Sequence, residues 1–364
     1  MKELKEKNYL PILELNDGTP VTKENWEQRK AEMLDLLQKY SYGYTPKTPV
    51  KVSGELKEIG RQICAGICKD EIYEITYETE FGKSSFPIEI FTPVSVEKPP
   101  VFLHIAFGKT PNKFMPLEEI MEAGYAVVVV DYCDLVNDNH HGDYSDGVAK
   151  HFGTTINRGP EEWGKIGMWA WGASRVMDFL VEQRTDLDLE KVVVIGHSRL
   201  GKTALWCVAQ DPRFAGAISN NSGYGGAASS KYGTGENVSD FLRVGSWDWY
   251  CENFKKFGGE LEHSKPYDQS FLLALIAPRL LLVGSAKNDW AADPEAEFLT
   301  SLHASPAWEL YGEKGLITPE EMPKTGAFLG EGNILYHYRE GEHYLSRHDW
   351  HAYIKFLDEK FNLN

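Results

Sequence analysis

The chain has 364 residues, of which 42% are hydrophobic and 25% are charged, a balance typical of a globular protein with a substantial core. Its 38 basic and 54 acidic residues give a formal net charge of −16, which argues against nucleic acid or an anionic membrane surface as a partner. The sequence has no run of about 18 apolar residues, so we expect no membrane span. We find no internal repeat, low-complexity segment or linker, and we therefore expect one domain over residues 1–364 and a monomer.

The cysteines and the N-terminus add two further expectations. Five cysteines, an odd number without dense spacing, do not indicate a disulfide framework. The Cys64-x3-Cys68 pair lacks a second pair of metal ligands, so we expect no zinc site there. We also expect no cofactor. Residues 1–18 contain no apolar signal core, which leaves open both an intracellular protein and one that begins after a removed signal.

The N-terminal part of the chain predicts a loop, a helix and then antiparallel strands. We expect residues 1–20 to be extended and residues 22–40 to form an amphipathic helix capped at Thr22, within an extension over 1–50 that packs on the domain. Three following segments alternate apolar and polar residues, as half-exposed antiparallel strands do: 51–59, 71–79 and 86–93.

The rest of the chain alternates continuously apolar segments with helical ones. Buried strands are predicted at 101–107, 126–131, 192–195, 214–219, within 276–290 and at 333–339. Helices are predicted at 116–123, 163–183, 202–208 and the C-terminus, and 237–258 also has helical tendency. This alternation predicts an α/β fold, a three-layer sandwich around a mostly parallel sheet. The long polar segment 134–162 is expected to be functional or mobile.

A sharp turn between a buried strand and a helix singles out Ser198. The strand Val192–Ile195 leads into Gly196-His-Ser-Arg-Leu-Gly201, and a helix is predicted from Lys202. A serine on such a turn projects from the edge of the sheet above a helix N-terminus, whose N–H groups can stabilise an oxyanion. The match to G-x-S-x-G is imperfect, because Leu200 occupies the position of the second glycine. An ordinary strand–turn–helix connection with a surface serine is the alternative.

A nucleophilic serine needs a base, and that base needs an acid to orient it. On sheets of this type the chain order is serine, then aspartate or glutamate, then histidine. Asp289 follows the strand in 276–290, and His343 follows the last strand, which fits that order. Asp293 lies on the same loop as Asp289 and is the alternative acid.

Three other histidines are weaker candidates for the base. His337 lies within the last predicted strand, where a core histidine is the ordinary expectation, and His348 and His351 fall on the terminal helix, where we expect them to be solvated.

Four segments carry a family resemblance: GHSRLGKTALW, SNNSGYGGAA, IAPRLLLVGSAKNDWAADPEAEF and EGEH. They resemble the glucuronoyl esterases of carbohydrate esterase family fifteen, especially the bacterial branch, over roughly residues 85–360. The resemblance implies an α/β-hydrolase fold, no metal, and cleavage of the ester between 4-O-methyl-glucuronic acid on xylan and lignin alcohols. The alternatives are deacetylation of xylan or another small carbohydrate ester, and a catalytically weak carbohydrate-binding homologue.

The resemblance also implies roles for individual residues. Ser198 matches the family nucleophile, His343 its base, and Arg199 the arginine that lines the oxyanion hole. Lys202 matches a sugar-contacting lysine and Glu236 a sugar-bonding glutamate. On the residues alone, Arg199 and Lys202 are equally consistent with a solvated helix face, and Glu236 with a surface loop.

The sequence departs from the family pattern at two positions. Asn221 stands where many members carry the acid as a glutamate, so the acid must come from elsewhere, and Asp289 is the expected source. Trp290 lies near the family's substrate tryptophan but one position early.

Overall fold

The computed structural model describes residues 9–60, 63–319 and 322–363, so residues 1–8 of the predicted N-terminal loop lie outside the described residues. Within these ranges one ten-stranded sheet has the order β1-β2-β3-β5-β4-β6-β7-β8-β10-β9. The strands are β1 (Lys51–Ile59), β2 (Cys68–Thr79), β3 (Gly82–Pro93), β4 (Val101–Ala106), β5 (Ala126–Asp131), β6 (Val192–His197), β7 (Gly216–Asn220), β8 (Leu280–Ala286), β9 (Ala327–Leu329) and β10 (Ile334–Arg339).

Helices of different length connect and cover these strands. The α-helices are α2 (Trp26–Leu37), α3 (Leu117–Glu122), α4 (Tyr132–Leu135), α5 (Gly147–His151), α6 (Lys165–Gln183), α7 (Arg199–Gln210), α8 (Val238–Val244), α9 (Gln269–Ala274), α10 (Pro294–Ala304), α11 (Pro306–Glu309) and α12 (Arg347–Phe361). The short helices of other types are η1 (Gln38–Tyr42), η2 (Cys64–Gly66), η3 (Leu189–Lys191), η4 (Ser246–Trp249), η5 (Glu252–Phe257) and η6 (Gly259–Ser264).

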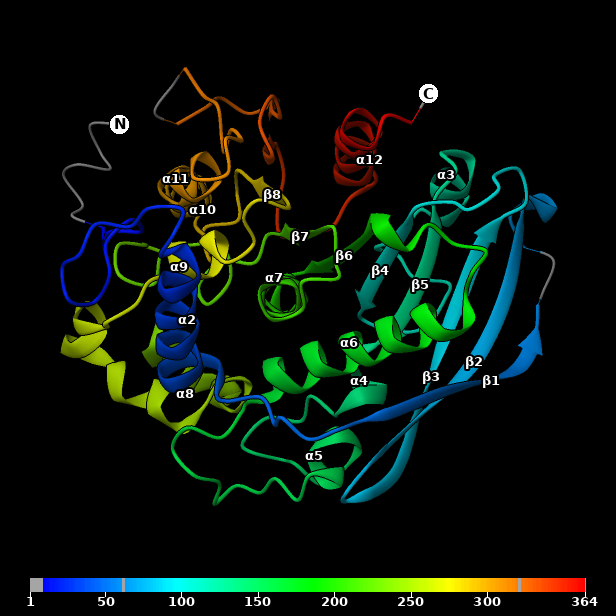
Figure 1. Cartoon of the computed structure of the whole chain (residues 1–364), viewed down its shortest axis with the longest axis horizontal. Helices are drawn as coiled ribbons and strands as arrows, with labels where there is room; N and C mark the ends of the chain where they lie inside the picture. The colour runs from blue at the N-terminus through cyan, green and yellow to red at the C-terminus, as the bar shows by residue number, and fades with distance from the viewer. Residues whose placement is uncertain (1–8, 61–62, 320–321, 364) are drawn as a thin grey trace.

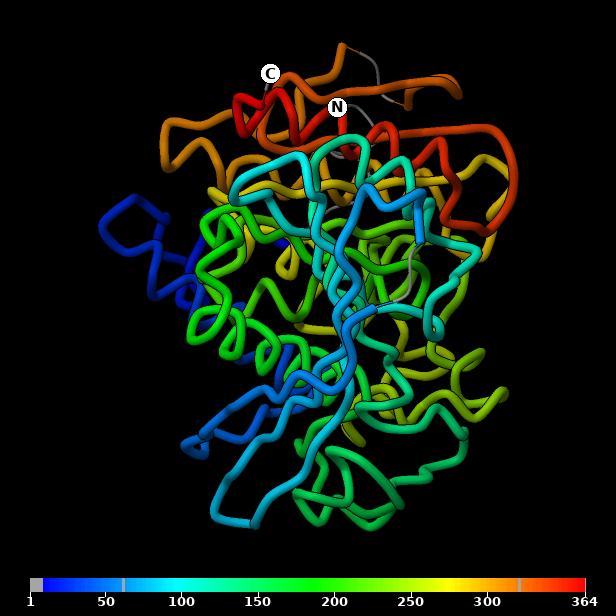
Figure 2. Tube along the Cα trace, turned by 90° about the vertical axis from the view of Figure 1, so that its right-hand side faces the viewer, coloured from blue at the N-terminus to red at the C-terminus, as the bar shows by residue number. Residues whose placement is uncertain are grey.

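The sheet has an antiparallel part and a parallel part. Strands β1, β2 and β3 pair antiparallel, as their alternating sequences predict, and β3 joins β5 antiparallel. From β5 through β4, β6, β7 and β8 to β10 every pair is parallel. In Figure 2 the blue-to-cyan strands β1–β3 cross the side of the molecule that faces the viewer. The parallel part therefore supplies the strand ends that carry the site.

Both faces of the parallel sheet are covered, which explains the continuous apolar runs. In β6, Val192 and Val194 belong to one core cluster, whereas Val193 and Ile195 belong to the other. In Figure 1 helices α6 and α7 lie below the strands and α12 and α3 lie above them. The prediction of a mostly parallel sheet between two helical layers is confirmed.

Two local predictions were wrong in detail. The first helix begins at Trp26 and not at residue 22, because Asn25 Oδ1 accepts the Thr22 N–H at 2.7 Å and the preceding residues form a turn. The helical tendency of segment 237–258 is confirmed in short pieces, because Gly245 has φ 85° and separates α8 from η4. Helix α7 begins at Arg199, three residues earlier than predicted.

Among the described residues, none of the helices has both the length and the apolar character needed to cross a bilayer.

Candidate active site

Ser198 lies on a strained turn between β6 and α7. Its φ of 58° and ψ of −128° fall outside the regions that non-glycine residues favour. The Ser198 N–H donates to the Asn220 carbonyl at the end of β7, at 2.9 Å, and its own carbonyl accepts the Gly201 N–H at 2.9 Å. Neighbouring backbone thus holds the serine in place at the N-terminus of α7, whose first N–H groups lie beside it.

Close packing within the turn explains the shifted glycine. A Cβ at Gly196 would lie 2.0 Å from the Leu200 carbonyl oxygen, so only glycine fits there. At position 201 a Cβ would approach Ser222 Cβ to 3.0 Å, which also favours glycine. Leu200 itself is fully buried in the core. The turn therefore requires glycine at 196, favours glycine at 201, and buries an apolar side chain at 200.

His343 and Asp289 meet because the register of β8 and β10 continues beyond both strands. Ala286 pairs with Arg339 at the strand ends, and two backbone bonds follow: Lys287 N–H to the Arg339 carbonyl at 3.0 Å and Asn288 N–H to the Gly341 carbonyl at 2.9 Å. His343 Nδ1 then donates to Asp289 Oδ2 at 2.6 Å. This bond fixes the tautomer that leaves Nε2 able to accept a proton.

Asn221 supports Asp289 from the other side. Its Nδ2 donates to Asp289 Oδ2 at 2.8 Å, from a backbone position with φ 48°. Burial raises the pKa of Asp289, but the hydrogen bonds from His343 and Asn221 outweigh burial and lower that pKa below its usual value. The residue that replaces the family glutamate thus helps to keep the nearby carboxylate ionised.

The ring of His197 packs against the ring of His343, with centroids 4.5 Å apart. His197 Nδ1 donates to Asn220 Oδ1 at 2.7 Å, and burial, together with the charge of His343, lowers the His197 pKa to about 3. His197 is therefore neutral near neutral pH and supports the His343 ring without competing for the proton.

Arg339 holds the loop that carries His343. Its Nε donates to the Asp349 carboxylate at 2.9 Å, while Nη1 and Nη2 donate to the carbonyls of Glu340 and Glu342 at 3.0 and 3.2 Å. Arg339 was not predicted to support the site, although an arginine at the end of a mostly apolar strand indicates a buried charge that needs a partner.

The alternative acid and the alternative base have other partners. Asp293 caps α10 by accepting the Ala296 N–H at 3.0 Å, and its other oxygen accepts the Gly235 N–H at 3.2 Å. His337 is buried in β10, with Nε2 3.4 Å from Asp349 Oδ1. Neither residue lies among those that line the cavity described next.

A cavity of about 580 Å³ brings together the residues that the resemblance selects: Ser198, Arg199, Lys202, Glu236, Asp289, Trp290 and His343. Asn221, Trp249 and Glu342 also line it. A larger cavity of about 660 Å³, between α6 and residues 45–52, shares none of these lining residues. The cavity at Ser198 is therefore the candidate site.

The residues expected to contact the sugar differ in their burial. Lys202 is buried and its Nζ donates to the Ser222 carbonyl at 2.6 Å; burial lowers its pKa, and the nearby Glu236 opposes that shift. The Glu236 N–H donates to the Ala291 carbonyl at 3.2 Å, which ties its loop to the loop of Asp289. Trp290 is 75% exposed at the rim. The structure thus excludes the solvated-face interpretation for Lys202.

Arg199 lies beside Ser198 with its guanidinium over an aromatic ring. Its Cζ is 4.5 Å from the centroid of the Trp249 ring, and Nη1 forms an ion pair with Asp138 Oδ2. Asp138 and Trp249 were not predicted from the sequence, because neither directly follows a predicted strand and no motif includes them.

The arrangement suits acyl transfer. It combines a hydroxyl on a strained turn, an imidazole held in one tautomer, and a permanently charged guanidinium beside the hydroxyl. In the part of the chain that the structure describes, no three His, Cys, Asp or Glu side chains are grouped as metal ligands would be.

Comparisons with known proteins identify one family. A family model described as fungal glucuronyl esterase matches residues 75–312. Carbohydrate esterase MZ0003, from an unknown prokaryotic organism, is 32% identical, over 94% of this chain and 87% of that protein. The glucuronoyl esterase from Solibacter usitatus has a similar structure, with a TM-score of 0.87 and 32% identity over 97% of this chain and 98% of that one.

A fungal relative is longer than this chain. The 4-O-methyl-glucuronoyl methylesterase of Podospora anserina is 30% identical over 74% of this chain, and the match covers 53% of that enzyme. The chain thus spans about half the length of this fungal relative.

Proposed function

The chain belongs to the glucuronoyl esterase family of α/β-hydrolases, which are carboxylic ester hydrolases, and on that premise we propose that it hydrolyses esters of 4-O-methyl-glucuronic acid carried on xylan. The alcohol side of the bond would be a lignin alcohol, as the family resemblance implies. Ser198, His343 and Asp289 form the proposed triad.

The proposed reaction has two acyl-transfer steps. His343 Nε2 accepts the proton of Ser198 as Oγ attacks the ester carbonyl, and the first N–H groups of α7 and Arg199 stabilise the oxyanion. Protonated His343 then gives its proton to the leaving alcohol. Water activated by His343 attacks the acyl-enzyme, and the free uronic acid leaves.

Lys202 and Glu236 are the proposed sugar contacts, with Trp290 at the rim. A lysine ammonium and a carboxylate on one cavity wall suit the hydroxyl groups of a sugar ring, because the first donates and the second accepts hydrogen bonds. A small acetyl ester needs neither residue.

One observation carries the proposal: the bond of 2.6 Å between His343 Nδ1 and Asp289 Oδ2, in a cavity that Ser198 also lines. An acid–base pair beside a serine on a strained turn supports ester hydrolysis over sugar binding alone.

The test compares the wild type with Ser198→Ala on methyl and benzyl glucuronate. We expect hydrolysis by the wild type and none above background by the folded variant. Substantial turnover by Ser198→Ala would remove Ser198 as nucleophile. Faster turnover of 4-nitrophenyl acetate than of the glucuronates would favour the deacetylase alternative. A fluorophosphonate probe that fails to label wild-type Ser198 would favour the non-catalytic homologue.

A further inference from the structure

The guanidinium of Arg199 is held by groups from outside its own helix. Nη1 pairs with Asp138 Oδ2, and the Trp249 and Phe107 rings lie 4.5 and 5.5 Å from Cζ. Arg199 Nε is buried and has no hydrogen-bond partner among the described residues. The protein therefore holds the guanidinium in place through Asp138 and the two rings, beside the cavity that Ser198 and Arg199 line.

Asp138 is itself fixed on both carboxylate oxygens. Trp249 Nε1 donates to Oδ1 at 2.7 Å, and the Tyr132 hydroxyl donates to Oδ2 at 3.1 Å. The Asp138 side chain is 6% exposed, so solvent screens its interaction with Arg199 only weakly. Trp249 thus contacts Arg199 twice, through its ring face and through Asp138.

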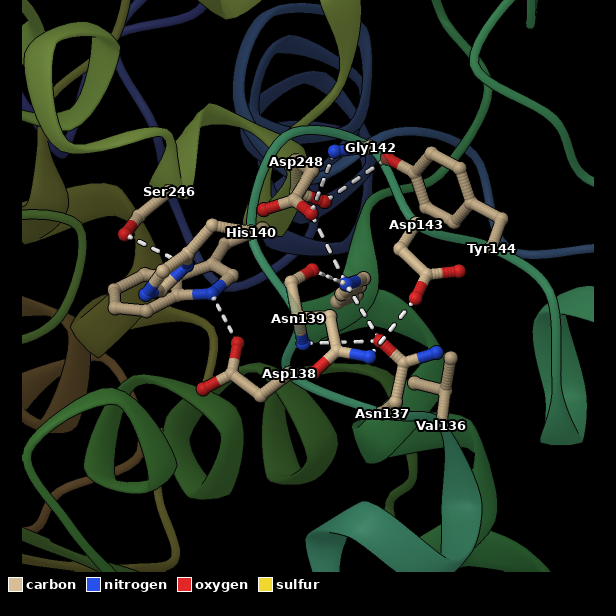
Figure 3. A network of polar contacts seen from close by, with 12 residues as sticks. Val136, Asn137, Asp138, Asn139, His140, Gly142, Asp143, Tyr144, Ser246 and Asp248 are labelled. Carbon is tan, nitrogen blue, oxygen red and sulfur yellow. Dashed lines mark hydrogen bonds and ion pairs between the residues drawn. The ribbon is translucent and has the colours of Figure 1, made fainter.

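A buried lysine joins the two segments that supply these groups. Lys165 Nζ, at the start of α6, donates to the carbonyl of Asn139 at 2.7 Å and lies 3.0 Å from Asp248 Oδ2. Asn139 follows Asp138 in the chain, and Asp248 precedes Trp249. Asp248 Oδ2 also accepts the Gly142 N–H at 3.1 Å, which closes the network between residues 136–144 and η4 (Figure 3).

We propose that Asp138 is a positioning residue for the reaction, which together with Trp249 aims the Arg199 guanidinium at the oxyanion that forms on the substrate of Ser198. The proposal rests on the proposed function only in requiring acyl transfer at Ser198. It assigns a role to the long polar segment 134–162, which no part of the triad uses.

The physical reason is preorganisation. A free arginine side chain has many rotamers, and orienting it during the reaction costs conformational entropy. The ion pair and the ring face fix the guanidinium before the substrate binds. A donor that is already oriented stabilises an oxyanion most effectively, because it does not have to reorganise during the reaction. Asp138 reduces the net charge beside Ser198, so its benefit comes from geometry and not from added positive potential.

The first experiment measures kcat and KM for Asp138→Asn, Arg199→Ala and the double variant on methyl glucuronate. Asp138→Asn keeps the side-chain shape and removes the charge. We expect kcat to fall about 10- to 100-fold with KM nearly unchanged, because a misplaced donor loses part of the effect of about 10²–10³ that a missing one has. In the Arg199→Ala background the same change should have almost no effect, because its target is gone.

The second experiment asks whether Asp138 can hold a guanidinium that is not attached to the chain. Millimolar methylguanidinium should restore part of the activity of Arg199→Ala. It should fail to restore the double variant, because the carboxylate that binds the ion is missing. A purely structural role for Asp138 would not produce this difference.

Two controls keep the test independent of folding. Asp143→Asn changes another carboxylate of the same segment, one that accepts the Asn139 side chain at 2.9 Å and does not contact Arg199, and it should leave kcat unchanged. Trp249→Phe keeps a ring and removes the N–H donated to Asp138; it should lower kcat less than Asp138→Asn does. If Asp138→Asn does not fold by circular dichroism, Trp249→Phe carries the test.

The proposal is overturned if Asp138→Asn lowers kcat equally with and without Arg199, if it leaves kcat unchanged or raises it, or if methylguanidinium rescues both backgrounds alike. A chain that turns over another ester but no glucuronate would refute the proposed substrate and not this inference. In that case Asp138→Asn, Arg199→Ala and the double variant are compared in their turnover of that ester. They are also compared in the rate at which a fluorophosphonate labels Ser198, a reaction in which negative charge also develops on an oxygen.

Discussion

The two sides of the cavity around Ser198 are held by different means. On the acid–base side, Asp289 and His343 extend from neighbouring parallel strands, and backbone hydrogen bonds continue the register of β8 and β10 almost to both residues. On the cationic side, Arg199 meets Asp138 and Trp249, which come from two segments without regular pairing. Each side has a buried ion pair behind it, Arg339–Asp349 and Lys165–Asp248 respectively.

The buried ion pairs Arg339–Asp349 and Lys165–Asp248 support their segments in different ways. Arg339 lies on a strand of the sheet and adds side-chain bonds to a loop that the strand already directs. Lys165 lies on helix α6, and its side chain joins segment 136–144 to η4. Fewer backbone hydrogen bonds join these two segments than join the loops that follow β8 and β10. We therefore expect the acid–base side to tolerate loss of a supporting charge better than the cationic side does.

The largest effect is expected for Asp289→Asn, on the acid–base side. The amide cannot hold the imidazole in the required tautomer or balance its charge, so kcat should fall by up to about 10⁴ while the fold persists. Steady-state kinetics on methyl glucuronate measures this. An equal loss in Asp293→Asn, with Asp289→Asn unaffected, would assign the acid to Asp293.

Lys165→Met tests how the cationic side is held. It leaves the fully buried Asp248 carboxylate without a counter-charge, so the free energy of unfolding should fall by about 3–5 kcal/mol. Denaturant unfolding followed by fluorescence measures it. The double variant Lys165→Met/Asp248→Leu should recover most of the loss, and a single variant as stable as the wild type would contradict the role of the pair.

Arg199→Ala tests the cationic side at the reacting atoms. Loss of an oxyanion donor should lower kcat about 10²- to 10³-fold, with a smaller change in KM. The same glucuronate assay applies. An unchanged rate would confine Arg199 to a structural role and would remove the reason for the Asp138 network.

The smallest effect is expected for Trp290→Ala, which belongs to neither side. Its ring is exposed at the rim, so a bound sugar would cover only part of its apolar surface. We expect KM to rise a few-fold with kcat unchanged, and more on a xylan-linked ester than on methyl glucuronate. A fall in kcat would place Trp290 closer to the reacting bond than its exposure indicates.

The acid–base side could be predicted from the sequence because its residues, Asp289 and His343, follow two strands of the sheet. Asp289 and His343 each follow a buried apolar run, and parallel pairing brings such ends to one edge of a sheet. Asp138 lies in a loop and Trp249 in a short 3₁₀ helix, where no periodicity indicates which side chains meet. The long segment 134–162 was noticed for its length, but its partners could not be assigned from composition.

Gly201 and Asn221 also make contacts that the sequence pattern alone does not predict. A motif gives residue types in order, but the space around each Cβ decides which positions need glycine. Asn221, which departs from the pattern that the resemblance implies, contacts Asp289 through an amide donor. Both features depend on neighbours from β7 and β8 that are distant in the sequence.

The exposure of the proposed base has a consequence for the size of the substrate. The His343 side chain is 44% exposed, and Trp290, which lines the same cavity, is more exposed still. The proposed base is therefore accessible from the surface of the protein. If the proposed function is correct, we expect an ester attached midway along a polysaccharide to reach this base as readily as one at a chain end.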